Sequence, residues 1–264
     1  MEKNNKGQVT IFIIIALIIV AAVVLFLVFR QRLGDDVGKL PDQLNARTFL
    51  EICLEDRVYE VLAIIGEHGG YIDPTVKKYK NYQLQGEQFS ADIAYLCYNK
   101  NNYGNCVNQE PLLLEHIEQE IKNNLSFDVR DCFDKLGNSL QNDGYVVNAV
   151  YKGFELTMKE KEIVIGINGS LTLTRADQTT KEENLEIKVP SEFYQLSRVV
   201  QEIVSQESKY CTFSIIGYSI FYPKWEIRII STSDDVLIYR VENKKTNELF
   251  KFAIEGCVRS PGLG

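Results

Sequence analysis

The chain has 264 residues, of which 45% are hydrophobic and 25% charged, and its formal net charge is −7. The charged residues of both signs are dispersed along the chain, and the basic ones form no stripe. This pattern argues against a nucleic-acid partner and against peripheral binding to anionic lipid. After the N-terminal region the chain is long enough to bury one large hydrophobic core or two small ones.

An apolar segment lies close to the N-terminus. Residues 9–29 contain no charge, proline or glycine, which predicts a transmembrane helix across a hydrocarbon core about 30 Å thick. A buried helix of a soluble core would show a polar face, and a cleaved secretory signal would have a shorter apolar run and a small-residue cleavage site. We therefore expect the lipid bilayer as partner of residues 9–29, with residues 1–8 as a short cytoplasmic tail or signal.

Residues 30–41 contain Gly34, Gly38 and Pro41 and are expected to form a hinge. The six cysteines all follow this hinge and include no C-x-x-C pair, which favours disulfides in an extracytoplasmic domain over a metal or redox site. Two Asn-x-Ser triplets, at Asn124 and Asn168, are candidate N-glycosylation sites and favour the same location. The cysteines are Cys53, Cys97, Cys106, Cys132, Cys211 and Cys257.

The region 42–143 is predicted to be helical, with one long loop closed by cysteines. Apolar residues at three- and four-residue steps predict a helix over 42–67, and two further helices are expected over 112–125 and 127–140. Residues 73–109 are rich in Asn, Lys and Tyr, and we expect a surface excursion stapled by a Cys97–Cys106 disulfide. If the first and third helices pack together, Cys53 and Cys132 would be bonded, although six cysteines permit 15 connectivities.

The region 144–264 is predicted to be a β-rich α+β domain in which a helix packs on an antiparallel sheet. Alternating apolar residues predict a strand meander from residue 145 to residue 190, with turns at Lys152-Gly153, at 159–161, at Asn168-Gly169 and at 176–180. Residues 191–207 are expected to be a helix. Further strands are expected over 211–218, 220–223, 225–231, 235–242 and 249–256, and a Cys211–Cys257 bond would close this half of the chain.

The segment from Lys6 to Phe12 resembles the class III signal segments of archaeal flagellins and type IV pilin-like proteins. This resemblance implies cleavage between Gly7 and Gln8. Phe12 stands where bacterial type IV pilins have a glutamate, and archaeal flagellin-type helices also lack this glutamate.

The same start, followed by Cys53-Leu54-Glu55 and 69–72 and ending with 239–242 and 250–253, resembles a group of uncharacterised membrane-anchored surface proteins of small-genome archaea. The second resemblance covers most of the chain and implies a location and an architecture.

The sequence predicts no catalytic residue, cofactor or metal site. His68 is expected to cap a helix end and His116 to lie at a helix surface, and neither has the spacing of a metal or nucleophile motif. Five tyrosines lie in the polar excursion, and they would suit protein or glycan recognition, or else cover the edge of the domain's own core. They are Tyr79, Tyr82, Tyr95, Tyr98 and Tyr103, whereas Tyr218, Tyr222 and Tyr239 are expected to be structural strand residues.

These features predict a single-pass, extracytoplasmic cell-surface protein that works without catalysis, as a recognition, adhesion or pilin-like structural component. Its partners would be the same protein or other surface proteins. Two alternatives remain: a membrane-tethered enzyme on the secreted side, which requires a pocket with converging acids or histidines, and an accessory subunit of a membrane complex.

Overall fold

The computed structural model describes residues 42–75, 78–79, 82–84, 87–89, 92–100, 104–232 and 236–256. All of these except 42–45 belong to one compact unit that begins at Ala46. Within the described part of the chain, no helix is both long and apolar enough to cross a membrane. The expectations for the tail, the apolar segment 9–29, the hinge and the Gly7-Gln8 cleavage site concern residues outside this part.

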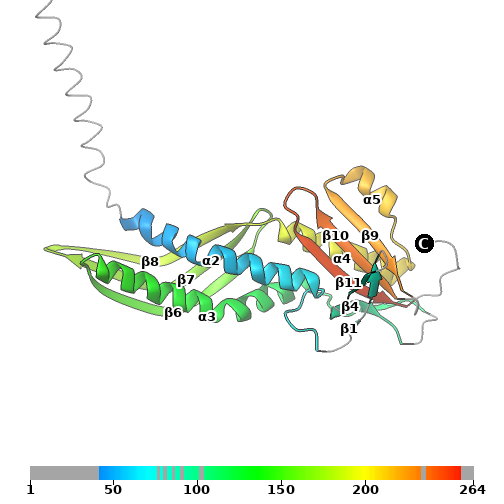
Figure 1. Cartoon of the computed structure of the whole chain (residues 1–264), viewed down its shortest axis with the longest axis horizontal. Helices are drawn as coiled ribbons and strands as arrows, with labels where there is room; N and C mark the ends of the chain where they lie inside the picture. The colour runs from blue at the N-terminus through cyan, green and yellow to red at the C-terminus, as the bar shows by residue number, and fades with distance from the viewer. Residues whose placement is uncertain are drawn as a thin grey trace, which may run out of the picture. The chain divides into compact units, whose positions relative to one another are not determined.

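Two long helices lie side by side in Figure 1: α2 (Asp42–Glu67), with the bounds expected from the sequence, and α3 (Leu113–Asn142). The prediction of two separate helices over 112–125 and 127–140 is wrong, because α3 is continuous through both. Ser126, expected to separate them, donates its hydroxyl to the carbonyl of Asn123 (2.8 Å) and so stays within the helix.

A disulfide between Cys53 and Cys132, with the Cα atoms 6.0 Å apart, joins α2 to α3 as expected. Beside it the Arg57 guanidinium donates to Asp128 Oδ2 and to the Asn124 amide oxygen, both at 3.1 Å. The buried stripes of both helices face the main hydrophobic core. The helix pair is therefore held by a covalent bond, a polar cluster and apolar packing.

A three-stranded antiparallel sheet lies along these helices, in the order β6 (Val146–Met158), β7 (Glu162–Arg175), β8 (Gln178–Pro190). The turns predicted at Lys152-Gly153 and Asn168-Gly169 are wrong. Both positions are register shifts within long strands, and they lie opposite each other, with Gly153 paired to Asn168. Gly153 adopts φ +126°, and a Cβ on Gly169 would lie 2.4 Å from the carbonyl oxygen of Val150. The glycines thus permit a bulge rather than a chain reversal.

A second, six-stranded sheet is built around the last described strand. Its main path runs β1-β4-β11-β10-β9, and β5 pairs with β4. The strands are β1 (Lys78–Tyr79), β4 (Ile93–Tyr98), β5 (Val107–Asn108), β9 (Trp225–Ser231), β10 (Leu237–Asn243) and β11 (Leu249–Glu255), and a separate pair is formed by β2 (Tyr82–Leu84) and β3 (Glu87–Phe89).

Strand β4 differs from what the sequence predicted for residues 93–98. Residues 93–98 were expected within a surface excursion, but β4 is buried and pairs in parallel with β11, so the sheet is not wholly antiparallel. Strand β4 lies before the expected domain boundary at 143/144 and pairs with β11, which lies after it, so the two expected regions share a sheet. The Cys97–Cys106 disulfide is present, with a Cα separation of 5.2 Å. Cys211 is also disulfide-bonded, and its expected partner Cys257 lies outside the described residues.

Two helices complete the second sheet. Helix α4 (Phe193–Tyr210) begins two residues after the start expected for the helix over 191–207 and ends three residues beyond its expected end. Its apolar side joins the main core. Residues 215–221, expected in two strands, form the short helix α5 (Ile215–Phe221) instead. The hydroxyl of Ser214 accepts from the Gly217 N–H (3.3 Å), and this N-cap outweighs the strand preference of the β-branched isoleucines.

Candidate recognition surface

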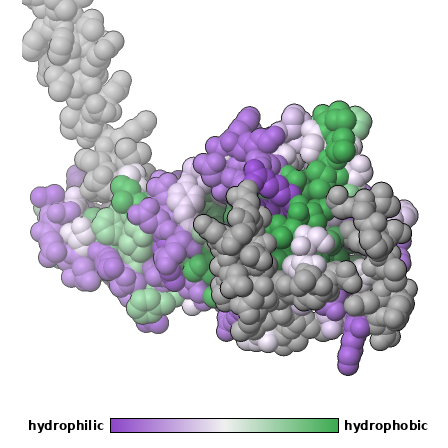
Figure 2. Space-filling model, turned by 45° about the vertical axis from the view of Figure 1, so that its right-hand side comes forward, coloured by the Kyte–Doolittle hydropathy of each residue, from purple (hydrophilic) through white to green (hydrophobic). Residues whose placement is uncertain are grey.

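Helix α5 presents an exposed apolar surface. Ile216, Ile220 and Phe221 have exposed fractions of 79%, 72% and 79%, and α5 contains no buried residue. From Tyr210 to Pro223 the chain carries no charge. The apolar surface at the upper right of Figure 2 lies over α5, the helix at the upper right of Figure 1. Contiguous exposed apolar surface of this kind marks contact sites in many soluble domains.

A groove of about 870 Å³ lies between the outer face of α4 and the segment that leads from α5 into β9. Most of the side chains that α4 contributes are polar and recur at three- and four-residue steps, and Val199 and Ser205 also line the groove. The opposite side of the helix is buried. Asn108 and Pro111, which precede α3, and Glu160, in the β6–β7 turn, also line the groove. Its principal lining residues are Asn108, Pro111, Glu160, Tyr194, Gln195, Arg198, Gln201, Glu202, Gln206, Tyr218, Tyr222, Lys224 and Trp225.

Aromatic rings form one side of this groove. The rings of Tyr218 and Tyr222, one helical turn apart, have centroids 4.7 Å apart and are tilted by 37°. The Nζ atom of Lys224 lies 4.6 Å from the centroid of the Trp225 ring, within the range of a cation–π contact. Burial, and then the nearby Glu202 carboxylate, raise the pKa of Tyr218 to about 12. The Tyr218 hydroxyl therefore stays protonated at neutral pH.

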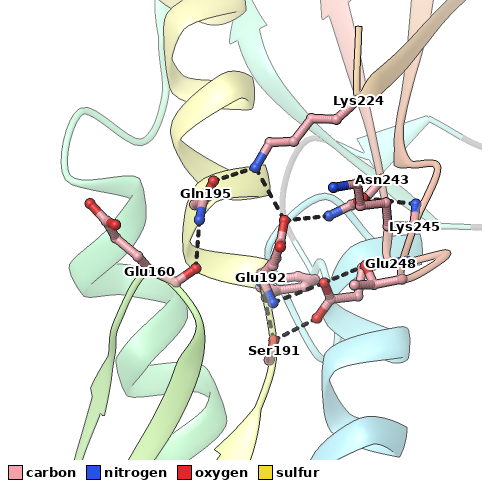
Figure 3. Close-up of polar contacts among 10 residues, drawn as sticks. Glu160, Ser191, Glu192, Gln195, Lys224, Asn243, Lys245 and Glu248 are labelled. Carbon is pink, nitrogen blue, oxygen red and sulfur yellow. Dashed lines mark hydrogen bonds and ion pairs between the residues drawn. The ribbon is translucent and has the colours of Figure 1, made fainter. Parts of the chain in front are cut away.

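A polar network fixes the start of α4 beside the groove (Figure 3). Glu192 Oε2 accepts from Lys224 Nζ (3.1 Å) and from Asn243 Nδ2 (2.8 Å). Lys224 also donates to the side-chain oxygen of Gln195, whose amide nitrogen donates to the carbonyl of Glu160 (2.8 Å). Lys224, just before β9, thus links this segment to α4, and Gln195 links α4 to the β6–β7 turn.

The β10–β11 turn supplies a second carboxylate to the same helix end. Glu248 Oε1 accepts from Ser191 Oγ (2.5 Å), and Glu248 Oε2 accepts from the Glu192 N–H (3.0 Å). A carboxylate at a helix N-terminus is favoured by the free N–H groups and by the helix dipole. Beside it lies a more apolar hollow of about 740 Å³, lined by residues that include Tyr59, Phe193 and Leu249.

The two histidines lie near each other but outside both hollows. His68 Nδ1 is 2.8 Å from the carbonyl oxygen of Ile72, just past the end of α2. The ring of His116 packs on that of Tyr71, with centroids 4.3 Å apart, and its Nε2 is buried without a hydrogen-bond partner. Burial, and then its hydrogen bond to Glu110, raise the pKa of Tyr71. Among the described residues, no group of three or more His, Cys, Asp or Glu could hold a metal ion.

Tyr95 and Tyr98, the two tyrosines of the polar excursion whose side chains the structure describes, do not line the groove or belong to α5. Tyr95 is buried in β4 and packs edge-on against the half-buried Tyr98, with centroids 5.2 Å apart. The side chains of Tyr79, Tyr82 and Tyr103 lie outside the described residues. Sequence reasoning assigned Tyr218 and Tyr222 to strands as structural residues and missed this surface. The uncharged run from 210 to 223 is the sequence feature that could have indicated it.

The two candidate glycosylation sites differ in surroundings. Asn124 is half-buried in α3 and its amide oxygen is engaged by Arg57. Asn168 is exposed at the bulge of β7. Asn168 is therefore the more accessible of the two acceptor side chains.

No protein-family model matches the chain, and no curated protein or solved structure matches it either.

Proposed function

We propose that the chain is a membrane-anchored, extracytoplasmic surface protein that works by recognition rather than catalysis, and that α5 contacts another surface protein. The apolar segment 9–29 would supply the anchor, and the class III resemblance at Gly7-Gln8 would supply a processing site. Pilin-like assembly is a special case in which the partner is a second copy of the chain.

The observation that carries this proposal is the exposure of Ile216, Ile220 and Phe221 on a folded, disulfide-linked domain. Exposed isoleucine and phenylalanine side chains gain free energy when a partner removes them from water, at about 25 cal/mol per Å² of apolar area. The Ser214 cap and the packing of Phe213 against Tyr218 hold α5 in place. Contact surfaces of this kind depend on a few buried anchor residues.

Two disulfides between described residues, and a third at Cys211, support the extracytoplasmic location, because such bonds persist in oxidising compartments. Intact and peptide mass spectrometry of the membrane-bound protein tests this location by reading the N-terminus and the thiol state together. Bridged cysteines are expected, and a start at Gln8 would add processing of the pilin type. Six free thiols would contradict the location.

The contact through α5 is tested by chemical cross-linking on intact cells that produce the protein. The double substitution Ile216→Ser/Phe221→Ser should remove the cross-linked product. Phe127→Ser is the matched control, because Phe127 is 74% exposed on α3. Loss of the product in both variants, or in neither, would contradict recognition through α5. The mass of the product distinguishes a second copy from another protein.

A further inference from the structure

We propose that the groove between α4 and the segment 218–225 binds a neutral glycan, an inference that rests on the proposed recognition role. Tyrosine rings would contact the glycan on one side of the groove, and planar polar side chains would contact it on the other. The groove volume, about 870 Å³, is sufficient for a short oligosaccharide.

The aromatic side is suited to the apolar faces of sugar rings. Tyr222 is 52% exposed and lines the groove together with Tyr218 and Tyr194. A tyrosine offers a rigid apolar ring with a hydroxyl at its tip, so it can stack on the C–H face of a pyranose and hydrogen-bond at its edge. The half-buried Tyr218 ring packs against both Phe213 and Tyr222, with centroids 5.3 and 4.7 Å away, so Tyr222 offers the more accessible stacking face.

The polar side is suited to sugar hydroxyls. Arg198, Glu202 and Gln206 recur every four residues along α4 and lie on the same side of the helix. Gln206 Nε2 donates to Glu202 Oε1 (3.3 Å), and Glu202 also forms a hydrogen bond with Tyr218. A carboxylate and an amide each have more than one acceptor or donor site, so their remaining sites can pair with neighbouring hydroxyls on the edge of a pyranose. Arg198 is exposed and lines the groove, so its guanidinium donors are accessible to a ligand.

The charge of the groove selects a neutral ligand. Its cationic residues are Arg198 and Lys224, and its anionic residues are Glu160 and Glu202. Lys224 forms an ion pair with Glu192 and packs over the Trp225 ring. Its ammonium group is therefore less available to pair with an anionic ligand. A nucleotide, a phosphorylated peptide or an acidic polysaccharide would need an excess of cationic side chains.

The groove is pre-organised on two sides. Gln195 is held between Lys224 and the carbonyl of Glu160, and the Glu248 carboxylate fixes the start of α4 (Figure 3). A ligand would therefore find the groove formed before it binds, and less ordering entropy would oppose binding.

The test uses the full chain in a zwitterionic detergent, since detergents with sugar headgroups would compete for the groove. Trp225 is the single tryptophan and lines the groove, so its fluorescence reports binding. The probes are neutral hexasaccharides of glucose, mannose, galactose and N-acetylglucosamine. An oligogalacturonate tests whether an acidic glycan binds, and an uncharged Gly-Ser-Thr dodecapeptide tests whether an extended peptide binds. Calorimetry provides a second measurement of binding.

Saturable binding of at least one neutral hexasaccharide is expected, with little binding of the oligogalacturonate. Tyr222→Ala and Arg198→Ala should each weaken that binding by about tenfold, as expected for loss of one ring contact or one charge-assisted hydrogen bond. Tyr210→Ala is the matched control, because Tyr210 is 70% exposed and does not line the groove. Its affinity should stay unchanged.

Absence of binding by all four neutral probes would overturn the inference, as would binding that Tyr222→Ala leaves unchanged. Tighter binding of the dodecapeptide, lost in the same variants, would assign the groove to a peptide and overturn the glycan. Ile216→Ser/Phe221→Ser changes α5 outside the groove lining, so failure of the glycan and failure of the α5 contact are separate results.

Discussion

The hydroxyl of Tyr239, in the middle of β10, donates to the carboxyl group of Glu207 on α4, and both side chains are buried, with 0% and 1% exposure. This hydrogen bond joins the face of the sheet to the helix that forms the groove. The Tyr239 ring also stacks on Phe252, with centroids 5.1 Å apart, so the hydroxyl is held in place by apolar packing.

Tyr239→Phe should lower the free energy of unfolding by about 1–3 kcal/mol, because it leaves a buried carboxyl oxygen without this donor. Urea denaturation followed by circular dichroism measures the change. The double variant Tyr239→Phe/Glu207→Leu should recover part of the loss, since neither polar group is then left in the core. Additive losses in the double variant would show that the two groups do not interact.

The two disulfides between described residues should differ in their contribution to stability. The Cys53–Cys132 bond spans 79 residues and the Cys97–Cys106 bond spans 9. Loop-closure entropy then predicts losses of about 4.5 and about 2.6 kcal/mol, respectively, when each pair is replaced by alanine. Urea midpoints of the two double variants test the order. A larger loss for the shorter loop would show that native-state packing, rather than chain entropy, dominates.

Gly66 allows α2 to approach the β10–β11 turn closely. A Cβ on Gly66 would lie 2.0 Å from the carbonyl oxygen of Leu249, so Gly66→Ala forces a backbone shift and should cost about 1–3 kcal/mol. Gly166→Ala is the matched control, because a Cβ there has no atom within 4 Å. Thermal unfolding should separate the two variants, and equal midpoints would contradict the close approach.

Acid should weaken the network at the start of α4. Burial acts to raise the pKa of Glu192, but hydrogen bonds from Lys224 and Asn243 outweigh it, so the pKa lies below its usual value. A carboxylate with a lowered pKa contributes its full stability above the usual glutamate pKa of about 4.3, and loses it as the pH falls through the folded-state pKa.

Glu192→Gln should therefore lower the free energy of unfolding at pH 7 by about 1–2 kcal/mol, and the difference from the wild type should shrink below about pH 4. Urea titrations at several pH values measure it. Glu186→Gln, an exposed residue of β8, should show little effect at any pH. A difference between Glu192→Gln and the wild type that does not change with pH would contradict the lowered pKa.

Much of the architecture follows from sequence periodicity. The bounds of α2, the helix at α4 and the strands of the last hairpins are readable because their apolar spacing is regular, and the bonded pairs Cys53–Cys132 and Cys97–Cys106 follow from the helices and loop that they join. Glycines at 153 and 169 were misleading, because a glycine permits a turn and a bulge equally well.

The groove was less accessible to sequence reasoning. The polar side of α4 has helical spacing, but nothing local shows that the segment 218–225 lies across from it. Residues 215–221 have the composition of a strand, and the Ser214 cap decides the local conformation. Likewise β4 is a short apolar run in polar surroundings, and its burial depends on pairing with β11, which lies far away in the sequence.

The position of β11 has a consequence for biogenesis. Residues 249–255 are the last described strand to be synthesised, yet they lie between β4 and β10 and pair with both. Strand β4 therefore completes its pairing only after the chain through residue 255 has emerged. Contacts of such long sequence separation form late and slowly. If the domain crosses a membrane, its second sheet closes only after β11 has been translocated, so the chain before β11 would reach the far side in a state that a translocation channel can still pass.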